Sequence, residues 1–390
     1  IEKYNNSTTK SVKFRHFKSM QFLSAIPASS YWAFGSALLV AVMLVLTKRW
    51  HGPLSLDLTV GVQKVHEHPT PRIGGVAIMA GLLAAWMVAK PERQLILGPL
   101  LLASQPAFLF GLLEDITRRV SVLTRLLATV FSGVLGWMIT GVSLSDVGVF
   151  GFDWLLSHTW FSVVFTGFAV GGVANALNII DGMNGLASGS AIVALLGLTL
   201  INLVLGDYNL AFASFALAAS VLGFWLVNWP KGRLFLGDGG AYLVGFMLAW
   251  SCVLTAERNP SVSPFAMLLL CAYPVTEVLF SVFRRKKRMR NPGRPDHLHL
   301  HSLVMRRWMS RYFGKTAANA ATGLVLTAFS LVPALLAVLL YNERLLSVLA
   351  TLMVVLLYLT MYARLVNFRW TSPLCFFSHK PVLVPAHQHL

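Results

Sequence analysis

Charged residues are scarce in this sequence. Asp, Glu, Lys and Arg make up 12% of the 390 residues, whereas they make up roughly 25% of an average soluble protein. Hydrophobic residues make up 56%, and the mean hydropathy is +0.66. A water-soluble fold has too little interior to hide so much apolar surface. The composition therefore excludes a disordered protein and an ordinary cytosolic enzyme, and it indicates a protein that crosses a membrane several times.

Cysteines and acidic residues are also few. The three cysteines, Cys252, Cys271 and Cys375, have neither a disulfide spacing nor a metal-ligand spacing, so we interpret them as structural. Fifteen Asp and Glu residues stand against 32 Lys and Arg residues, and the formal net charge is +17. Because the basic residues follow the loops between apolar segments, this charge indicates membrane topology, and we expect no nucleic-acid partner.

Eleven apolar runs are long enough, at about 17 residues or more, to cross a bilayer core of about 30 Å as helices. A segment in lipid must satisfy its own backbone hydrogen bonds, so open strands are excluded. Residues 29–366 would form the transmembrane domain, after an N-terminal extension at 1–28 and before a C-terminal tail at 367–390. We predict an all-α polytopic integral membrane protein with about 11 transmembrane helices, at 31–47, 73–89, 95–113, 122–142, 160–180, 188–205, 210–229, 240–256, 264–283, 319–341 and 345–365.

The distribution of Lys and Arg predicts the orientation. The odd-numbered loops between these helices carry nineteen Lys and Arg residues, and the even-numbered loops carry four. Basic loops stay in the cytoplasm, so the N-terminus would lie outside and the C-terminus inside. Five basic residues before Met20 oppose this orientation unless translation begins near Met20.

Several acidic residues on the odd-numbered loops stand in short polar motifs. Among them are Glu114 with Asp115, then Asp181, Asp238 and Asp296. Scattered carboxylates suit Mg²⁺, which shares its ligands with substrate phosphate, and nearby Arg and Lys residues would neutralise phosphate charge. This pattern favours a metal-assisted site for phosphorylated substrates on the cytoplasmic face. The alternative is that these carboxylates mark helix ends at the membrane surface.

Five motifs within residues 60–310 carry a family resemblance. They are 64–75, the acidic pair with Arg125 downstream, 175–185, the Gly-Asp-Gly-Gly turn at 237–240, and 295–306. In this order they resemble the polyprenyl-phosphate N-acetylhexosamine-1-phosphate transferases, glycosyltransferase family 4. That family includes the enzymes that start O-antigen and enterobacterial common antigen synthesis, and phospho-N-acetylmuramoyl-pentapeptide transferase. The last motif looks more like the O-antigen branch.

The resemblance implies an activity and its partners. Such enzymes transfer N-acetylhexosamine-1-phosphate from a UDP-sugar to undecaprenyl phosphate and release UMP, as the first step of a lipid-linked surface glycan. The implied cofactor is Mg²⁺, with Mn²⁺ as an alternative, and the implied place is the bacterial inner membrane with the site facing the cytoplasm. Membrane lipids would surround the protein, and family members are often homodimers.

The resemblance also assigns roles to individual residues. Asp115, with Glu114 before it, would sit beside the lipid phosphate as a base or as a positioning group. Asp181 and Asp238 would serve the metal ion, with Asp238 as the better candidate for a direct ligand. The candidates for binding the nucleotide, the diphosphate or other phosphate groups are Lys64, Arg125, Asn178, Asn184, Phe235, Arg294, His299 and His301.

Three positions depart from the family pattern, and one of them is Ser302, which stands where a further His is common. The acidic pair is Glu-Asp rather than Asp-Asp, and the longer Glu114 shifts its carboxylate by about 1.5 Å, to which a positioning-dependent site is sensitive. Asn184 stands where many members carry Asp. Because Asp115, Asp181 and Asp238 are all present, we still expect activity.

Other interpretations stay open at this point. His297, His299 and His301 alternate and would form one face of a strand, as in a Zn²⁺ site, but no fourth ligand is evident. A transporter of a lipid or nucleotide-sugar would carry polar groups at the membrane midplane and often an inverted repeat, and neither is visible. An inactive scaffold of the same fold is the remaining alternative.

Overall fold

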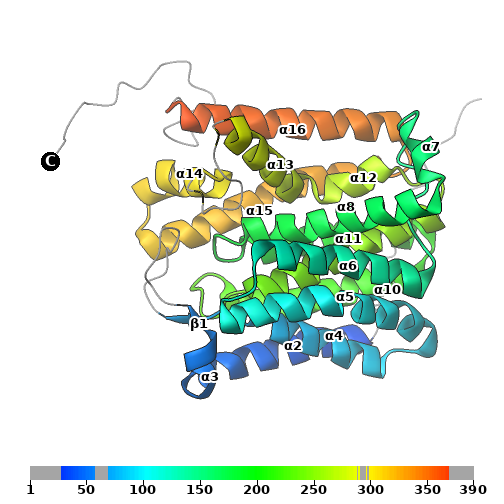
Figure 1. Cartoon of the computed structure of the whole chain (residues 1–390). Helices are drawn as coiled ribbons and strands as arrows, with labels where there is room; N and C mark the ends of the chain where they lie inside the picture. The colour runs from blue at the N-terminus through cyan, green and yellow to red at the C-terminus, as the bar shows by residue number, and fades with distance from the viewer. Residues whose placement is uncertain (1–27, 58–68, 288, 290–295, 297, 369–390) are drawn as a thin grey trace, which may run out of the picture.

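Helices dominate the computed structural model, which describes residues 28–57, 69–287, 289, 296 and 298–368. Figure 1 shows the long helices side by side, with their axes close to the horizontal. Among the described residues, nine helices are long and apolar enough to cross a membrane. They are α2 (Ala28–Leu46), α5 (Pro91–Thr117), α6 (Val122–Thr140), α8 (Thr159–Ile180), α9 (Leu186–Leu205), α10 (Tyr208–Asn228), α11 (Gly237–Arg258), α15 (Lys315–Leu339) and α16 (Arg344–Val366).

The all-α polytopic class is confirmed, and each of the eleven predicted apolar runs overlaps a helix. Two of them differ from simple spans. Helix α4 (Gly74–Val88) has 15 residues, so at 1.5 Å per residue it is shorter than a bilayer core of about 30 Å. The run 264–283 divides into α12 (Pro264–Leu270) and α13 (Ala272–Lys287), which meet at 83°. The count of eleven spans and the orientation stay predictions.

Polar side chains mark where some helices begin, and glycines mark where others end. The Ser121 hydroxyl accepts a hydrogen bond from Thr124 N at 3.1 Å and begins α6, and the Asp207 carboxylate caps α10 by accepting from Leu210 N at 3.0 Å. Gly141 and Gly206 end α6 and α9 in the left-handed conformation that glycine adopts without strain. Short local signals therefore divide the apolar sequence into separate helices.

The short elements gather at the two ends of the bundle. Helix α3 (Lys48–Ser55), the two-residue strand β1 (Leu56–Asp57) and α14 (Leu300–Arg307) lie at the left end of Figure 1, and α7 (Phe152–Leu156) lies at the right end. Strand β1 pairs antiparallel with β2 (Thr70–Pro71), and a 3₁₀ turn, η1 (Met309–Arg311), follows α14. Odd-numbered loops thus meet at one end of the bundle, as alternating spans require.

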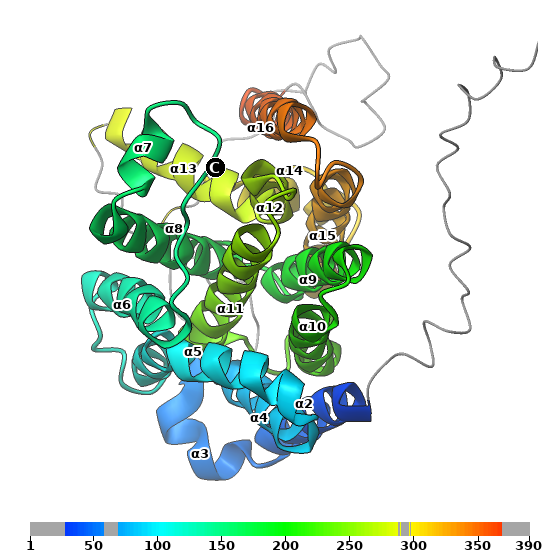
Figure 2. The ribbon, with the colours of Figure 1, turned by 90° about the vertical axis from the view of Figure 1, so that its right-hand side faces the viewer.

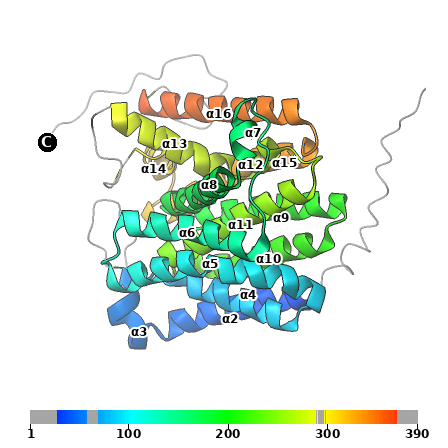
Figure 3. The ribbon, with the colours of Figure 1, turned by 45° about the vertical axis from the view of Figure 1, so that its right-hand side comes forward.

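Helix α11 forms the centre of the bundle. In its most apolar 18-residue stretch 94% of the residues are buried, against 28% for α2 and for α6. Figure 2, a view along the bundle, shows α5, α8, α9 and α12 around it. Figure 3 shows α13 running obliquely between α8 and α16 at the edge of the bundle. Helix α11 begins at the Gly-Asp-Gly-Gly motif that the sequence analysis singled out, and the residues of its first turn are buried.

Glycines let the backbones of α4 and α5 approach the start of α11. A Cβ atom on Gly111 would lie 2.6 Å from Gly239 N, and one on Gly75 would lie 2.4 Å from Gly240 N. Real Cβ atoms do not approach that closely, so larger residues would push these helices apart. Small residues allow such close packing between membrane helices, and here it brings the polar end of α5 against the first turn of α11.

Candidate active site

Asp115, in the last turn of α5, caps the N-terminus of α11. Its Oδ1 accepts a hydrogen bond from Asp238 N and its Oδ2 accepts one from Gly239 N, both at 2.9 Å. Backbone N–H groups in the first turn of a helix have no partner within the helix, and a carboxylate there also interacts favourably with the helix dipole. Asp115 is 1% exposed. Its carboxylate therefore fixes the position of the turn that carries Asp238.

Gly237 is required at the start of this turn. Its φ is +74°, and a Cβ atom would lie 2.0 Å from Arg72 O and 2.5 Å from the Asp115 carboxylate. A side chain would therefore be strained and would also collide with its surroundings. The glycine lets Arg72 and Asp115 close over the first turn of α11.

Arg72 bridges the two carboxylates. Its Nε donates to Asp115 Oδ1 at 3.1 Å, and its Nη2 donates to Asp238 Oδ1 at 3.4 Å. Asn178, near the end of α8, donates from Nδ2 to Asp238 Oδ1 at 3.0 Å. Arg125, in the first turn of α6, forms an ion pair with Asp238 Oδ2. We call Arg72, Asp115, Arg125, Asn178 and Asp238 the carboxylate cluster.

Charge is balanced within the carboxylate cluster. Two guanidinium groups face two carboxylates that are nearly buried, and a buried charge is tolerated only when it is paired and hydrogen-bonded. The Arg72 and Arg125 side chains keep 22% and 14% of their surface exposed. The cluster can therefore be reached by a ligand from the side of the two arginines.

Asp181 adds a third carboxylate directly after α8. Its surface is partly open, yet burial raises its pKa well above the usual range for Asp, and the negative charge of Asp115 raises it further. The Arg72 guanidinium acts in the opposite direction. A positive charge placed beside this carboxyl group would therefore strongly stabilise its ionised form.

The turn at 181–185 is held by asparagines from other helices. Asn319 Oδ1, on α15, accepts from Asn184 N at 2.7 Å, and Asn228 Oδ1, at the end of α10, accepts from Gly185 N at 2.6 Å. The Asn184 side chain donates from Nδ2 to Pro230 O at 3.0 Å. The structure therefore places Asn184 as a link between this turn and the connection from α10 to α11.

The two candidate histidines lie at the start of α14 and reach the Asp181 turn. The His299 and His301 rings are stacked, with centroids 5.4 Å apart and planes 5° apart. A Cβ atom on Gly182 would lie 2.5 Å from His301 Nε2, so the glycine makes room for this ring. Burial lowers the pKa of His301 to about 4, and the charge of His299 contributes to the same shift.

Two other candidates have visible structural contacts. Glu114 Oε2 accepts from Val120 N at 2.8 Å and closes the connection between α5 and α6. The backbone of Phe235 pairs with the segment before α4: its N–H donates to Pro71 O at 2.8 Å and its carbonyl accepts from Gly74 N at 2.9 Å. Its ring is partly exposed, and its role toward a base stays a prediction.

Some predicted residues cannot be placed. Lys64 and Arg294 lie outside the described residues, as does His297 of the alternative Zn²⁺ site. Within the described part of the chain, no group of three or more His, Cys, Asp or Glu side chains has an arrangement that could hold a metal ion. A metal ion at this site would therefore also need oxygen ligands from amides, substrate or water.

Sequence reasoning missed Arg72 as a site residue and treated it as a topology charge. The signal that could have found it is its place directly before Ile73, Gly74 and Gly75. Gly75 packs on α11 and Gly74 N donates to Phe235 O, so the residue that precedes them is carried to the same end of α11.

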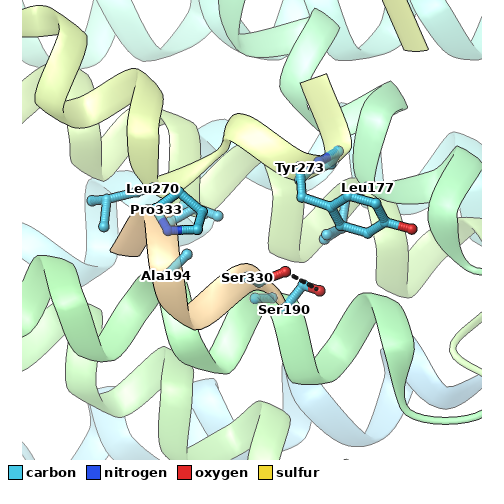
Figure 4. A pocket seen from close by; sticks show the side chains of 10 residues that line it. Leu177, Ser190, Ala194, Leu270, Tyr273, Ser330 and Pro333 are labelled. Carbon is cyan, nitrogen blue, oxygen red and sulfur yellow. Dashed lines mark hydrogen bonds between the residues drawn. The ribbon is translucent and has the colours of Figure 1, made fainter. Parts of the chain in front are cut away.

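A small cavity of about 10 Å³ lies elsewhere, at the bend between α12 and α13 (Figure 4). It is about large enough for one water molecule, and no member of the carboxylate cluster lines it. Ser190 and Ser330 form a hydrogen bond of 3.1 Å at its edge. Its lining includes Leu177, Ser190, Leu270, Tyr273, Ser330 and Pro333.

Comparison with known proteins identifies the family. The profile of glycosyl transferase family 4 matches residues 97–256, which include four members of the carboxylate cluster and Asp181. The undecaprenyl-phosphate alpha-N-acetylglucosaminyl 1-phosphate transferase of Thermotoga maritima is 32% identical over 269 residues, which are 69% of this chain and 76% of the relative. The enzyme of the same name from Yersinia pestis is 29% identical over 251 residues, 63% of this chain and 68% of the relative. The decaprenyl-phosphate N-acetylglucosaminephosphotransferase of Mycobacterium leprae is 30% identical over 275 residues, 62% of this chain and 68% of the relative. The chain thus belongs to glycosyl transferase family 4.

Proposed function

We propose that this protein transfers N-acetylhexosamine-1-phosphate from a UDP-sugar to undecaprenyl phosphate and releases UMP. The relatives carry names of this activity with N-acetylglucosamine as the sugar. The observation that carries the proposal is the carboxylate cluster, because two carboxylates, two arginines and an asparagine, from four helices and the segment before α4, meet at one end of a membrane bundle. A membrane enzyme that joins a lipid phosphate to a water-soluble nucleotide needs its charged site at such an end.

The reaction exchanges one phosphoanhydride for another. An oxygen of the lipid phosphate attacks the β-phosphorus of the UDP-sugar, the bond from this phosphorus to the bridging oxygen breaks, and UMP leaves. Charge on the phosphates dominates such a transfer, so catalysis depends on positioning and on neutralisation of charge. Arg72 and Arg125 are exposed enough to donate hydrogen bonds to phosphate oxygens. His299 and His301 would contact the diphosphate.

The donor set fits Mg²⁺. Asp238 and Asp181 offer carboxylate oxygens, and Asn178 offers an amide oxygen, which are the hard ligands that Mg²⁺ prefers. Asp238 Oδ2 is a buried oxygen that accepts no hydrogen bond from the described residues, although it pairs with Arg125. When bound, Mg²⁺ would offset the negative charge of the diphosphate, and Mn²⁺ is an alternative.

Asp115 acts in this proposal as a positioning residue. Three of its four lone-pair sites accept hydrogen bonds from Arg72, Asp238 N and Gly239 N. A general base must keep a lone pair within reach of the substrate, whereas Asp115 is almost fully enclosed. Its contribution is to hold Asp238 and Arg72 in one geometry.

The cellular setting follows from topology and chemistry together. The protein is a multi-pass membrane protein, and we place it in the bacterial inner membrane with the carboxylate cluster facing the cytoplasm, where nucleotide sugars occur. This placement uses eleven spans and the basic odd-numbered loops. The product would start an O-antigen type glycan, and a homodimer is the proposed assembly.

UMP release tests the function. Purified protein is incubated with undecaprenyl phosphate, Mg²⁺ and a panel of UDP-N-acetylhexosamines. We expect release that requires both the lipid and the metal and that identifies the sugar. No release with any donor from protein that is folded would contradict the proposal and would favour the inactive scaffold or the transporter.

A further inference from the structure

Glu277 is a buried carboxylate outside the carboxylate cluster. It lies on α13, one turn after Tyr273, and its exposed fraction is 0%. Its Oε1 lies 2.9 Å from His299 Nδ1, and its Oε2 accepts a hydrogen bond from Leu300 N at 3.2 Å. Glu277 therefore joins α13 to both the imidazole and the backbone at the start of α14.

The buried carboxylate of Glu277 needs a hydrogen-bonding partner, because an unpaired buried carboxylate is very costly. Two arginines on the same helix, Arg284 and Arg285, form ion pairs with Asp296. The His299 imidazole lies within hydrogen-bond distance of Glu277. The burial of Glu277 and the position of the His299 ring thus depend on each other.

A hydrogen bond at one ring nitrogen determines what the other can do. When Nδ1–H is donated to a carboxylate, the ring orientation and the site of protonation are fixed, and Nε2 points away from that carboxylate. The His299 ring is parallel to the ring of His301, which packs on Gly182 beside Asp181. The contact with Glu277 therefore holds the His299 ring against the His301 ring, which itself packs on the turn that follows Asp181.

We infer that Glu277 is a positioning residue for the transfer reaction, which acts by holding His299 so that its Nε2 faces the diphosphate of the UDP-sugar. This inference rests on the proposed function. It goes beyond that function because Glu277 itself touches no substrate and lies on α13, away from the carboxylate cluster. Its contact with Leu300 N also anchors α14, so a test must separate positioning of the ring from general stability.

A double-mutant cycle makes this separation. We expect E277Q to lower kcat/KM for the UDP-sugar by about 10- to 100-fold, as is usual when a group that orients a functional histidine is lost. H299Q removes the histidine itself and should lower kcat/KM at least as much. The double variant should be no worse than H299Q alone, because Glu277 acts through His299. The variant E277D keeps the charge and should recover part of the activity. Glu257, at the other end of α11, accepts hydrogen bonds from the backbone N–H and from the hydroxyl of Ser145. The variant E257Q is therefore the matched control, and its kcat/KM should be nearly unchanged.

Effects of E277Q and H299Q that multiply in the double variant would overturn the inference, as would full activity of E277Q. A nitrogen-15 spectrum of the histidines, with His299 assigned by comparison with H299Q, gives a readout that needs no turnover. We expect Nδ1 of His299 to be protonated in the wild type and the signal to shift in E277Q, or in E277D if E277Q does not fold. An unchanged signal would overturn the inference whatever the activity. Failure of the proposed function is distinct, because the wild type itself would then release no UMP.

Discussion

The substitution D115N tests whether Asp115 holds the site together. An Asn side chain keeps one carbonyl oxygen but turns an NH₂ group either toward Gly239 N or toward both Arg72 Nε and Asp238 N. In either orientation it removes the negative charge that faces Arg72. Breaking a buried pair costs about 3–5 kcal/mol, and loss of a helix cap alone costs about 1 kcal/mol. We expect the free energy of unfolding to fall by about 3 kcal/mol.

The same substitution should also reduce turnover, because Asp238 and Arg72 lose their common anchor. A displacement of about 1 Å in a catalytic site can cost about 100-fold in rate, so we expect a loss of at least that order in kcat. The assay is UMP release beside thermal unfolding in the same detergent. The neighbouring variant E114Q is the control for stability: Glu114 accepts one hydrogen bond from Val120 N, which a glutamine oxygen can still accept, so the free energy of unfolding should change by less than about 1 kcal/mol.

Unchanged thermal stability of D115N together with complete loss of turnover would refute this reasoning. Such a result would mean that the hydrogen bonds to α11 contribute little and that Asp115 acts on the substrate directly. A loss of stability and of turnover together, with E114Q close to the wild type, is the outcome that the capping geometry requires.

Three further predictions concern other groups around the cluster. R72K should lower kcat/KM by at least about tenfold, because a lysine has one nitrogen atom and cannot reproduce the rigid pair of donors, Nε and Nη2, with which Arg72 bridges Asp115 and Asp238; activity equal to the wild type would contradict the bridging role. N184D should lower the free energy of unfolding by about 1–3 kcal/mol, because a carboxylate would face Pro230 O in place of a donor; an unchanged melting temperature would contradict this contact. The His301 ring should bind a proton only below about pH 4 in the folded protein, because its pKa is lowered to about 4, whereas in the unfolded chain it binds one near pH 6.5. Stability should therefore fall as the pH decreases from about 6.5 to 4, and H301Q should reduce this fall in an unfolding series against pH; an identical pH dependence in H301Q would contradict it.

The sequence predicted the parts of the site that local patterns determine. Asp115, Asp238 and Asn178 each lie at a helix end within a polar motif, and alternating spans bring such ends together. The role of Arg72 could not be predicted from its charge, because a basic residue in a loop serves topology equally well. The contact of Asn184 with Pro230 depends on how α9, which follows Asn184, packs against α10, and no local sequence pattern predicts that packing.

The bend between α12 and α13 is a similar case. The run 264–283 is mostly apolar and long enough for one straight span, so length and hydropathy predict no break at Cys271; Pro274 is the local helix-breaking signal nearby. The two halves have different main neighbours: α12 packs mainly against α15 and α16, whereas α13 packs mainly against α8 and less extensively against α16 and α15. Their direction is thus set by tertiary packing, and it places Glu277 beside His299.

The central claim is that the first turn of α11 is the centre of a sugar-phosphate transfer. The most direct measurement is UMP release by the wild type and by D238N, each with undecaprenyl phosphate, a UDP-N-acetylhexosamine and Mg²⁺. We predict release by the wild type that stops when either the lipid or the metal is omitted, and loss of nearly all turnover in folded D238N. Equal rates in the two proteins, or no release by the folded wild type with any donor, would contradict the account.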